Sequence, residues 1–173
     1  KAKGNYYEGL EMASTSGHIG MWGGYYSGSA VLQARVGGSG INSSDVKAIE
    51  IDANGHVTMP SQPCFQARPS GVISNINVGS SQTLNLATEV FDLNADYNTS
   101  NYNFVAPVTG KYLLTLNLRV QALDVDGAYF QALILTSNKE YQSIISTNRF
   151  SADPSYWYVG VTVVADMDAS DTA

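Results

Sequence analysis

The chain has 173 residues, a formal net charge of −6 and only 14% charged residues. An acidic chain with nine Lys and Arg residues repels phosphate backbones, so no nucleic-acid partner is expected. No apolar run approaches the ~20 residues of a membrane-spanning helix, which argues against membrane insertion.

Residues 1–62 are interpreted as a fibre-like neck rich in glycine and aromatic residues. The stretch Gly17–Gly28 alternates glycine with aromatic and small polar residues, and such a segment loses much entropy when it is ordered alone. We therefore expect it to be ordered by other chains, as in an intertwined trimeric neck. The alternative is a flexible leader, although Trp22 and Tyr25 are unusual in a solvated linker. Residues 30–36 predict a short strand.

Residues 46–59 predict a β-hairpin around Gly55. A three-residue loop with Gly55 in the left-handed region pairs Ile51 with Val57 and keeps one face apolar, whereas a two-residue loop mixes the faces. The same register sets Asp52 opposite His56, which we interpret as a surface contact. The prolines that follow predict a junction between residues 62 and 63.

Residues 63–173 predict an all-β head, a β-sandwich or jelly roll. Apolar residues alternate through 102–122, where Pro107 and Gly110 divide the run into two strands, and again through 157–167. Weaker strands are predicted at 72–78, 84–91 and 128–136.

The head also resembles a known family. The family pattern is an aromatic residue, an acid or amide before Tyr, then Phe, five residues, Gly, any residue and Tyr. The matching positions in this sequence are Phe91, Asp96, Tyr97, Phe104, Gly110 and Tyr112, and Leu114 stands where the family usually has Phe. This pattern resembles the globular head of complement component one, subcomponent q, which is related in fold to tumour necrosis factor. The resemblance implies a ten-stranded jelly roll that forms a homotrimer. It also implies that the last two strands would follow Ala173 and are absent from this sequence.

The context of the head is similar to the distal end of phage tail fibres. No collagen-type Gly-X-Y repeat precedes the head, and residues 51–60 resemble the segments that lead into the terminal domain of such fibres. We therefore expect a trimeric virion fibre tip or receptor-binding head that attaches to a host surface protein or glycan, located on the virion surface or otherwise extracellular. The first alternative is a secreted cellular recognition or lectin-like module of the complement-head family. The second is a glycan-degrading enzyme carried by a fibre.

Catalysis is not expected, and no catalytic or cofactor-binding residue is assigned. The aspartates lie in turn-like sequences, where Asp is favoured for its local hydrogen bonds, rather than in a recognisable carboxylate pair. Asp124 and Asp126 resemble the start of a calcium loop, but the later ligands are missing, so they are weak candidates and calcium is the single ion considered.

Tyr156 and Tyr158 are the candidate surface residues. In the alternating strand 157–167 they face away from the apolar set that includes Trp157, which itself is expected to pack in the core. A tyrosine pair on the outward face suits either a trimer interface or a ligand surface.

Overall fold

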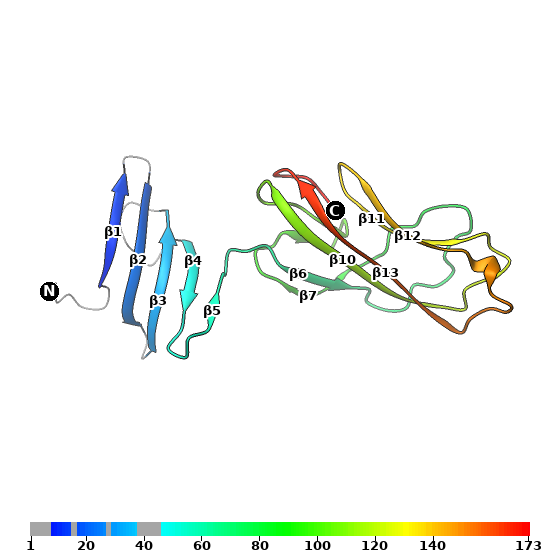
Figure 1. Ribbon diagram of the computed structural model, residues 1–173, viewed down its shortest axis with the longest axis horizontal. Coiled ribbons are helices and arrows are strands. Elements are labelled where there is room, and N and C mark those ends of the chain that lie inside the picture. Colours follow the sequence, from blue (N-terminus) through cyan, green and yellow to red (C-terminus); the bar gives the residue numbers. More distant parts are fainter. Residues whose placement is uncertain (1–7, 15–16, 27–28, 38–45) are drawn as a thin grey trace. The chain divides into compact units, whose positions relative to one another are not determined.

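The computed structural model describes residues 8–14, 17–26, 29–37 and 46–173, and its chain divides into two compact units, Lys1–Cys64 and Phe65–Ala173 (Figure 1). The sequence placed the junction two residues earlier. In the described residues the regular elements are β-strands and one short 3-10 helix, so the predicted all-β class is confirmed.

The first unit contains one antiparallel sheet of five strands in the order β1-β2-β3-β4-β5. The strands are β1 (Glu8–Ser14), β2 (Gly17–Tyr26), β3 (Ser29–Val36), β4 (Val46–Ile51) and β5 (Val57–Thr58). β3 confirms the strand predicted at residues 30–36.

The glycine-rich stretch contains the strand β2. Residues 17–26 form β2, which pairs with β1 and β3 of the same chain, while residues 27–28 lie outside the described part. Strands of the same chain thus supply backbone partners to β2, because hydrogen bonds from two flanking strands satisfy an extended segment whatever its side chains are. Ordering by other chains stays a prediction.

The hairpin of β4 and β5 has the predicted register, with Ile51 opposite Val57. Gly55 has a φ of 84°, and its N–H donates to the Asp52 carbonyl at 3.0 Å, so the loop uses the left-handed glycine. Asp52 Oδ2 lies 2.9 Å from His56 Nδ1, and the hydrogen bond from that side chain lowers the pKa of Asp52. The His56 side chain is 74% exposed, which fits the predicted surface contact.

The second unit consists of four two-stranded pairs: β6 with β7, β8 with β9, β10 with β13, and β11 with β12. The strands and the single 3-10 helix are β6 (Phe65–Arg68), β7 (Thr88–Asp92), β8 (Tyr97–Asn98), β9 (Asn103–Phe104), β10 (Gly110–Gln121), β11 (Phe130–Leu135), β12 (Glu140–Ile145), η1 (Thr147–Arg149) and β13 (Tyr156–Met167). β9, β10, β11 and β13 confirm the strands predicted in 102–122, 128–136 and 157–167.

The strand predicted at 72–78 is wrong, because no strand is assigned between β6 and β7. Val72 and Val78 are about nine-tenths exposed, and Asn75 adopts a φ of 58°, which interrupts an extended backbone. The strand predicted at 84–91 begins only at Thr88. Alternation alone, without a partner strand and a surface to cover, did not produce a strand there.

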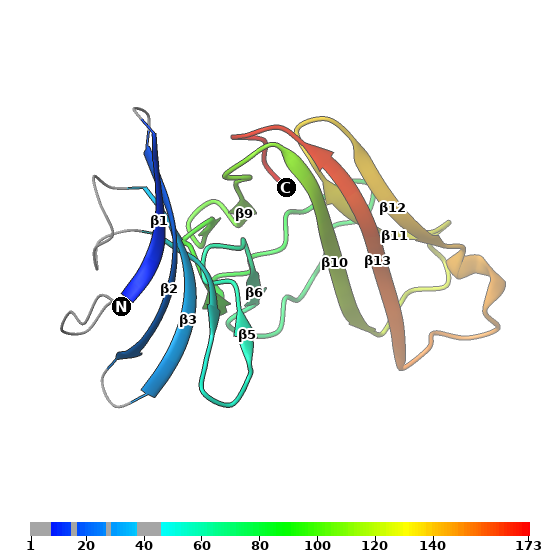
Figure 2. The ribbon, with the colours of Figure 1, turned by 60° about the vertical axis from the view of Figure 1, so that its left-hand side comes forward.

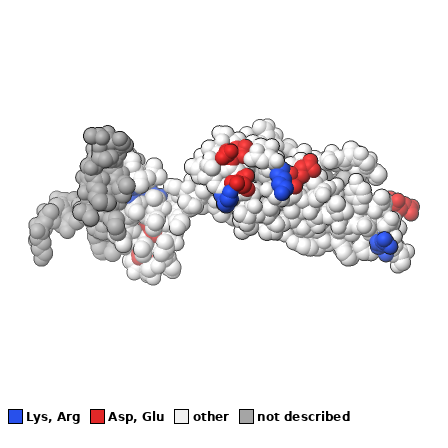
Figure 3. Space-filling view, turned by 45° about the horizontal axis from the view of Figure 1, so that its top comes forward, with Lys and Arg blue, Asp and Glu red and all other residues white. Residues whose placement is uncertain are grey.

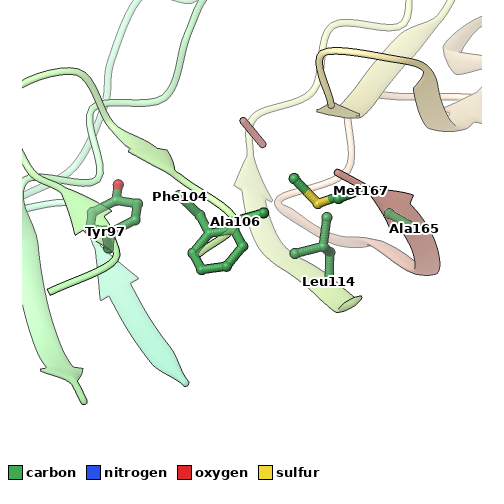
Figure 4. Packing of buried hydrophobic residues seen from close by; sticks show 6 residues of the cluster. All are labelled: Tyr97, Phe104, Ala106, Leu114, Ala165 and Met167. Atoms are coloured by element: carbon green, nitrogen blue, oxygen red, sulfur yellow. The ribbon is translucent and has the colours of Figure 1, made fainter. Parts of the chain in front are cut away.

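The second unit has two adjoining hydrophobic clusters. In one, the β11–β12 hairpin packs on the inner side of β10 and β13, around the buried Ala132, Val159 and Val161 (Figures 1 and 2). The other contains Tyr97, Phe104, Ala106, Leu114, Ala165 and Met167, which converge from β8, β9, β10, β13 and the segment between β9 and β10 (Figure 4). Two facing β-layers with apolar side chains between them are compatible with a β-sandwich.

Candidate interaction surface on strands β10 and β13

β10 and β13 form a long antiparallel ribbon, in register from the pair Gly110–Met167 to the pair Gln121–Tyr156. Successive side chains of a strand point to opposite faces, so each strand contributes to an inner and an outer face. On the inner face Val159, Ala165 and Met167 are at most 2% exposed. The inner face is thus part of the core.

The other face of the ribbon is covered by none of the described residues, and we call it the outer face. It consists of Lys111, Leu113, Thr115, Asn117, Arg119, Gln121, Tyr156, Tyr158, Gly160, Thr162, Val164 and Asp166. Leu113 and Val164 are cross-strand partners, yet they are 71% and 63% exposed. An apolar cross-strand pair in solvent is the feature of this face that suits contact with a partner.

The two predicted tyrosines lie on the outer face, toward the end of the ribbon opposite to the Leu113–Val164 pair. The Tyr158 ring leans over Gly160, where an added Cβ would meet its Cζ at 2.9 Å, and the Tyr158 hydroxyl donates to Asn117. Arg119 lies over the Tyr156 ring, with 5.5 Å between the guanidinium carbon and the ring centroid. Glycine at position 160 therefore lets a large aromatic ring lie along the sheet instead of standing away from it.

Charge on the outer face is low and mostly paired. Lys111 Nζ lies 2.5 Å from Asp166 Oδ2 at one end, which leaves Arg119 as the other charged residue of this face. Figure 3 shows few charged side chains on the visible face of the second unit, several of them with basic and acidic groups side by side. The outer face is thus a largely polar surface with one apolar pair and two tyrosines, and Arg119 is its one charged residue outside the Lys111–Asp166 ion pair, so it can pack against another surface with little desolvation of unpaired charge.

Most residues of the family-like signature are structural. Tyr97, Phe104 and Leu114 are buried in the same cluster, and the Tyr112 ring lies 5.4 Å from that of Phe104. Gly110 begins β10, and the Tyr112 hydroxyl donates back to the Val108 carbonyl. Phe91 differs, because it is 42% exposed on β7.

Tyr97 is fixed by a hydrogen bond inside this cluster. Its ring stacks on Phe65 at 4.9 Å, and its hydroxyl donates to the Leu86 carbonyl at 3.0 Å. We expect Tyr97→Phe to lower the free energy of unfolding by about 0.5–1.5 kcal/mol, because the carbonyl loses its donor while the ring stays. Urea denaturation measures the change, and Tyr129→Phe, at an exposed tyrosine, is the control with an expected effect near zero. Equal effects of the two substitutions would contradict this role.

Asp96, the acid of the signature, has an unfavourable position for a carboxylate. Its Oδ2 is buried without a hydrogen-bond partner, and burial, with a further contribution from the charge of Asp92, raises the pKa of Asp96. The Asp92 carboxylate, in contrast, has hydrogen-bond partners: it accepts hydrogen bonds from the backbone N–H groups of Asp96 and Tyr97 at 3.2 and 2.8 Å. Asp92 thus orders the loop, and Asp96 is constrained within it.

This arrangement predicts a pH dependence. A carboxyl whose pKa is raised in the folded state stabilises the fold below its unfolded pKa of about 3.9, and that contribution is lost as the pH rises through the folded pKa. We expect Asp96→Asn to fall less in stability than the parent chain as the pH is raised from about 4 to neutrality. Urea midpoints across this range test it; parallel pH profiles of the two proteins would show that Asp96 does not contribute.

The calcium candidates form a turn. The Asp124 carboxylate accepts the N–H of Asp126 at 2.8 Å, and the Asp153 carboxylate accepts that of Val125 at 3.0 Å. Both calcium candidates are exposed, and within the described residues no group of three or more His, Cys, Asp or Glu side chains is placed to hold a metal ion.

Two side chains are less buried than their sequences predict. Cys64, a lone cysteine that is predicted to be a small buried or half-buried residue, is exposed at the boundary between the two units. Trp157 was expected in the core but is 39% exposed, with its ring 4.8 Å from that of Phe150, because it lies at the start of β13 where the covering layer ends. In the part of the chain that is described, no helix has the length and apolar character to cross a membrane.

Alternation through 157–167 places Gly160 and Val164 on the same face as Tyr158, but neither of them, nor Leu113, was predicted to belong to the candidate surface. The available signal was phase: Leu113 and Val164 are apolar at positions that alternation assigns to solvent. Comparison with known proteins adds no family to this surface, because no family model, curated protein or solved structure matches the chain.

Proposed function

We propose that this chain is a structural and recognition protein, the homotrimeric tip of a virion tail fibre, whose head attaches to a host cell surface. The observation that carries the proposal is the outer face of β10 and β13, with its exposed Leu113–Val164 pair and two exposed tyrosines. Its fold is proposed to be a jelly roll of the complement-head type.

Self-association is the first step of the argument. Exposure of apolar cross-strand pairs to water is unfavourable. A partner that covers them stabilises the assembly by about 25 cal/mol for each Å² of apolar surface removed from water. A second and a third copy present the same face, with one apolar pair and two tyrosines among polar residues, so packing requires no burial of an unpaired charge beyond Arg119, which already contacts Tyr156. A homotrimer is the closed assembly that the family resemblance implies.

The strand order supports the jelly-roll proposal. β10 pairs with β13 although the β11–β12 hairpin lies between them in sequence, and that hairpin packs on the inner face of the ribbon. Such a crossing from one layer to the other and back is typical of Greek-key sandwiches. In this proposal the loops at the ends of the layers are free for recognition, and threefold repetition strengthens weak single contacts.

Surface recognition is tested with the purified 173-residue chain on a glycan array and on a panel of bacterial cells, after its mass in solution is known. Specific retention on one glycan class or one cell type, without turnover of the retained glycan, is the expected result. Release of shortened glycan would support the fibre-borne enzyme instead. If the chain is retained neither on the glycan array nor on bacterial cells but binds animal cell-surface proteins, the result would support the secreted complement-head-type module.

A further inference from the structure

The loop of the β4–β5 hairpin contains an asparagine that is directly followed by a glycine. Asn54 and Gly55 are both exposed. Apart from the neighbouring residues of the chain, no described heavy atom lies within 4 Å of the position that a Cβ on Gly55 would occupy. The φ of 84° favours glycine there, so the fold presents this Asn-Gly peptide bond to solvent with no side chain to shield it.

An asparagine side chain and the next backbone nitrogen can react with each other. The Gly55 nitrogen loses its proton to solvent base and bonds to Asn54 Cγ, the Cγ–Nδ2 bond breaks, and Nδ2 leaves as ammonia. One water then opens the five-membered succinimide at either of its carbonyl carbons, which gives aspartate or isoaspartate. Water is the one co-reactant, and glycine obstructs the attack least because it has no Cβ.

The hydrogen bonds of the loop oppose this reaction weakly. Gly55 N–H donates to the Asp52 carbonyl at 3.0 Å, and this bond has to open before the nitrogen can attack. β5 has only two residues, which pair with Glu50 and Ile51, and its Val57 is 60% exposed. A short edge strand with little buried apolar surface opens locally at a small free-energy cost, so the Gly55 nitrogen is regularly released.

The same loop is sensitive to the product. Asp52 Oδ1 accepts the N–H groups of Asn54 and His56 at 2.8 and 2.9 Å, and Asp52 N–H donates to the His56 carbonyl at 3.1 Å. An isoaspartate at position 54 adds one methylene to the main chain between the two N–H groups that bind this carboxylate. It also places a second carboxylate close to that of Asp52, and like charges repel. Both changes disfavour the closed loop.

We propose that Asn54 is a modification site, at which the folded chain converts asparagine to aspartate and isoaspartate without an enzyme, and that the isoaspartate form loosens β5 from β4. β5 is the last strand before the boundary between the two units, so the modification acts next to the junction. This proposal does not depend on the proposed fibre function or on the trimer.

Incubation of the full chain for several days in warm, mildly alkaline buffer, followed by peptide mapping with mass spectrometry, tests the site. Asn98 is the internal control, because it is also exposed but is followed by the β-branched Thr99. We expect residue 54 to be converted at least about tenfold faster than residue 98. Equal rates at the two positions would overturn the proposal, and so would conversion of residue 54 only after the chain is unfolded in urea.

Asn54→Gln is the matched variant for the chemistry. Its longer side chain would have to form a six-membered ring, so we expect no conversion at position 54 and an unchanged rate at Asn98. Conversion of the glutamine at the rate of the parent asparagine would overturn the succinimide route.

Amide hydrogen exchange of Asp52, measured by NMR, tests the effect on the hairpin. The isoaspartate form is separated from the incubated chain and compared with the parent and with Asn54→Asp, which carries the added charge on an unaltered main chain. We expect exchange at least about tenfold faster in the isoaspartate form and close to the parent rate in Asn54→Asp. Parent-like exchange in the isoaspartate form, or equal acceleration in Asn54→Asp, would overturn the proposed loosening by the longer main chain.

Discussion

Phe104→Ala is expected to lower the free energy of unfolding of the second unit by about 3–5 kcal/mol. Phe104 is 1% exposed, and its ring lies 5.2 Å from that of Phe65 at an interplanar angle of 9°. It also contacts Tyr112, so truncation removes the centre of an aromatic group and leaves a cavity that rigid strands cannot fill. Because domains are stable by only about 5–15 kcal/mol, such a loss is a large part of the total.

Urea denaturation followed by tyrosine and tryptophan fluorescence measures this loss, and Phe91→Ala is the matched control. Phe91 also belongs to the family-like signature, but it is 42% exposed, so we expect less than about 1 kcal/mol from its truncation. A Phe104→Ala effect no larger than that of Phe91→Ala would contradict the placement of Phe104 at the centre of the core.

Leu113→Asp is expected to convert the proposed trimer to monomers. Leu113 is 71% exposed in the single chain, so a carboxylate is well solvated there and the fold should be retained. In an assembly through the outer face the same carboxylate would be desolvated without a partner in every copy, which costs several kcal/mol for each site. The dissociation of the assembly should therefore be favoured by orders of magnitude.

Val78→Asp is the matched control for this substitution, because Val78 is 93% exposed and lies away from β10 and β13 in sequence and sheet. We expect the control to keep the mass of the parent protein, and circular dichroism to be the same for all three. Retention of the parent mass by Leu113→Asp would show that the outer face is not the interface.

The long strands were predictable because their sequences contain both a pattern and its limits. β10 and β13 alternate for twelve residues each, and Pro107 and Gly110 mark where the first run is divided. Residues 72–78 show the same pattern without the structure, because Val72 and Val78 have no surface to cover. Periodicity indicates which side chains can share a face. Whether a strand forms depends on a second layer that buries those side chains.

β12 shows the opposite case. Its sequence, Glu-Tyr-Gln-Ser-Ile-Ile, has mixed polar and apolar residues and predicted nothing, yet Tyr141 and Ile145 pack on the buried cluster of the β10–β13 ribbon. Its position is set by β11 through a short turn, in which Thr136 Oγ1 accepts the Lys139 N–H at 2.9 Å. Tertiary pairing of this kind is not contained in a local pattern.

The candidate surface was predictable only in part. Tyr156 and Tyr158 were identified as outward aromatic residues, and they lie on the outer face with exposed fractions of 60% and 66%. Alternation indicates that Leu113 and Val164 each face outward. That they lie opposite each other could not be predicted, because the two residues are far apart in sequence and their opposition depends on the register of β10 and β13. Register is a property of both strands together.

The mass of the 173-residue chain in solution tests the central claim most directly. Sedimentation equilibrium over a range of dilutions is expected to give three times the 18.5 kDa of one chain, with dissociation only in the Leu113→Asp variant. A folded chain that sediments as an 18.5-kDa monomer at every concentration would contradict the trimeric recognition head proposed here.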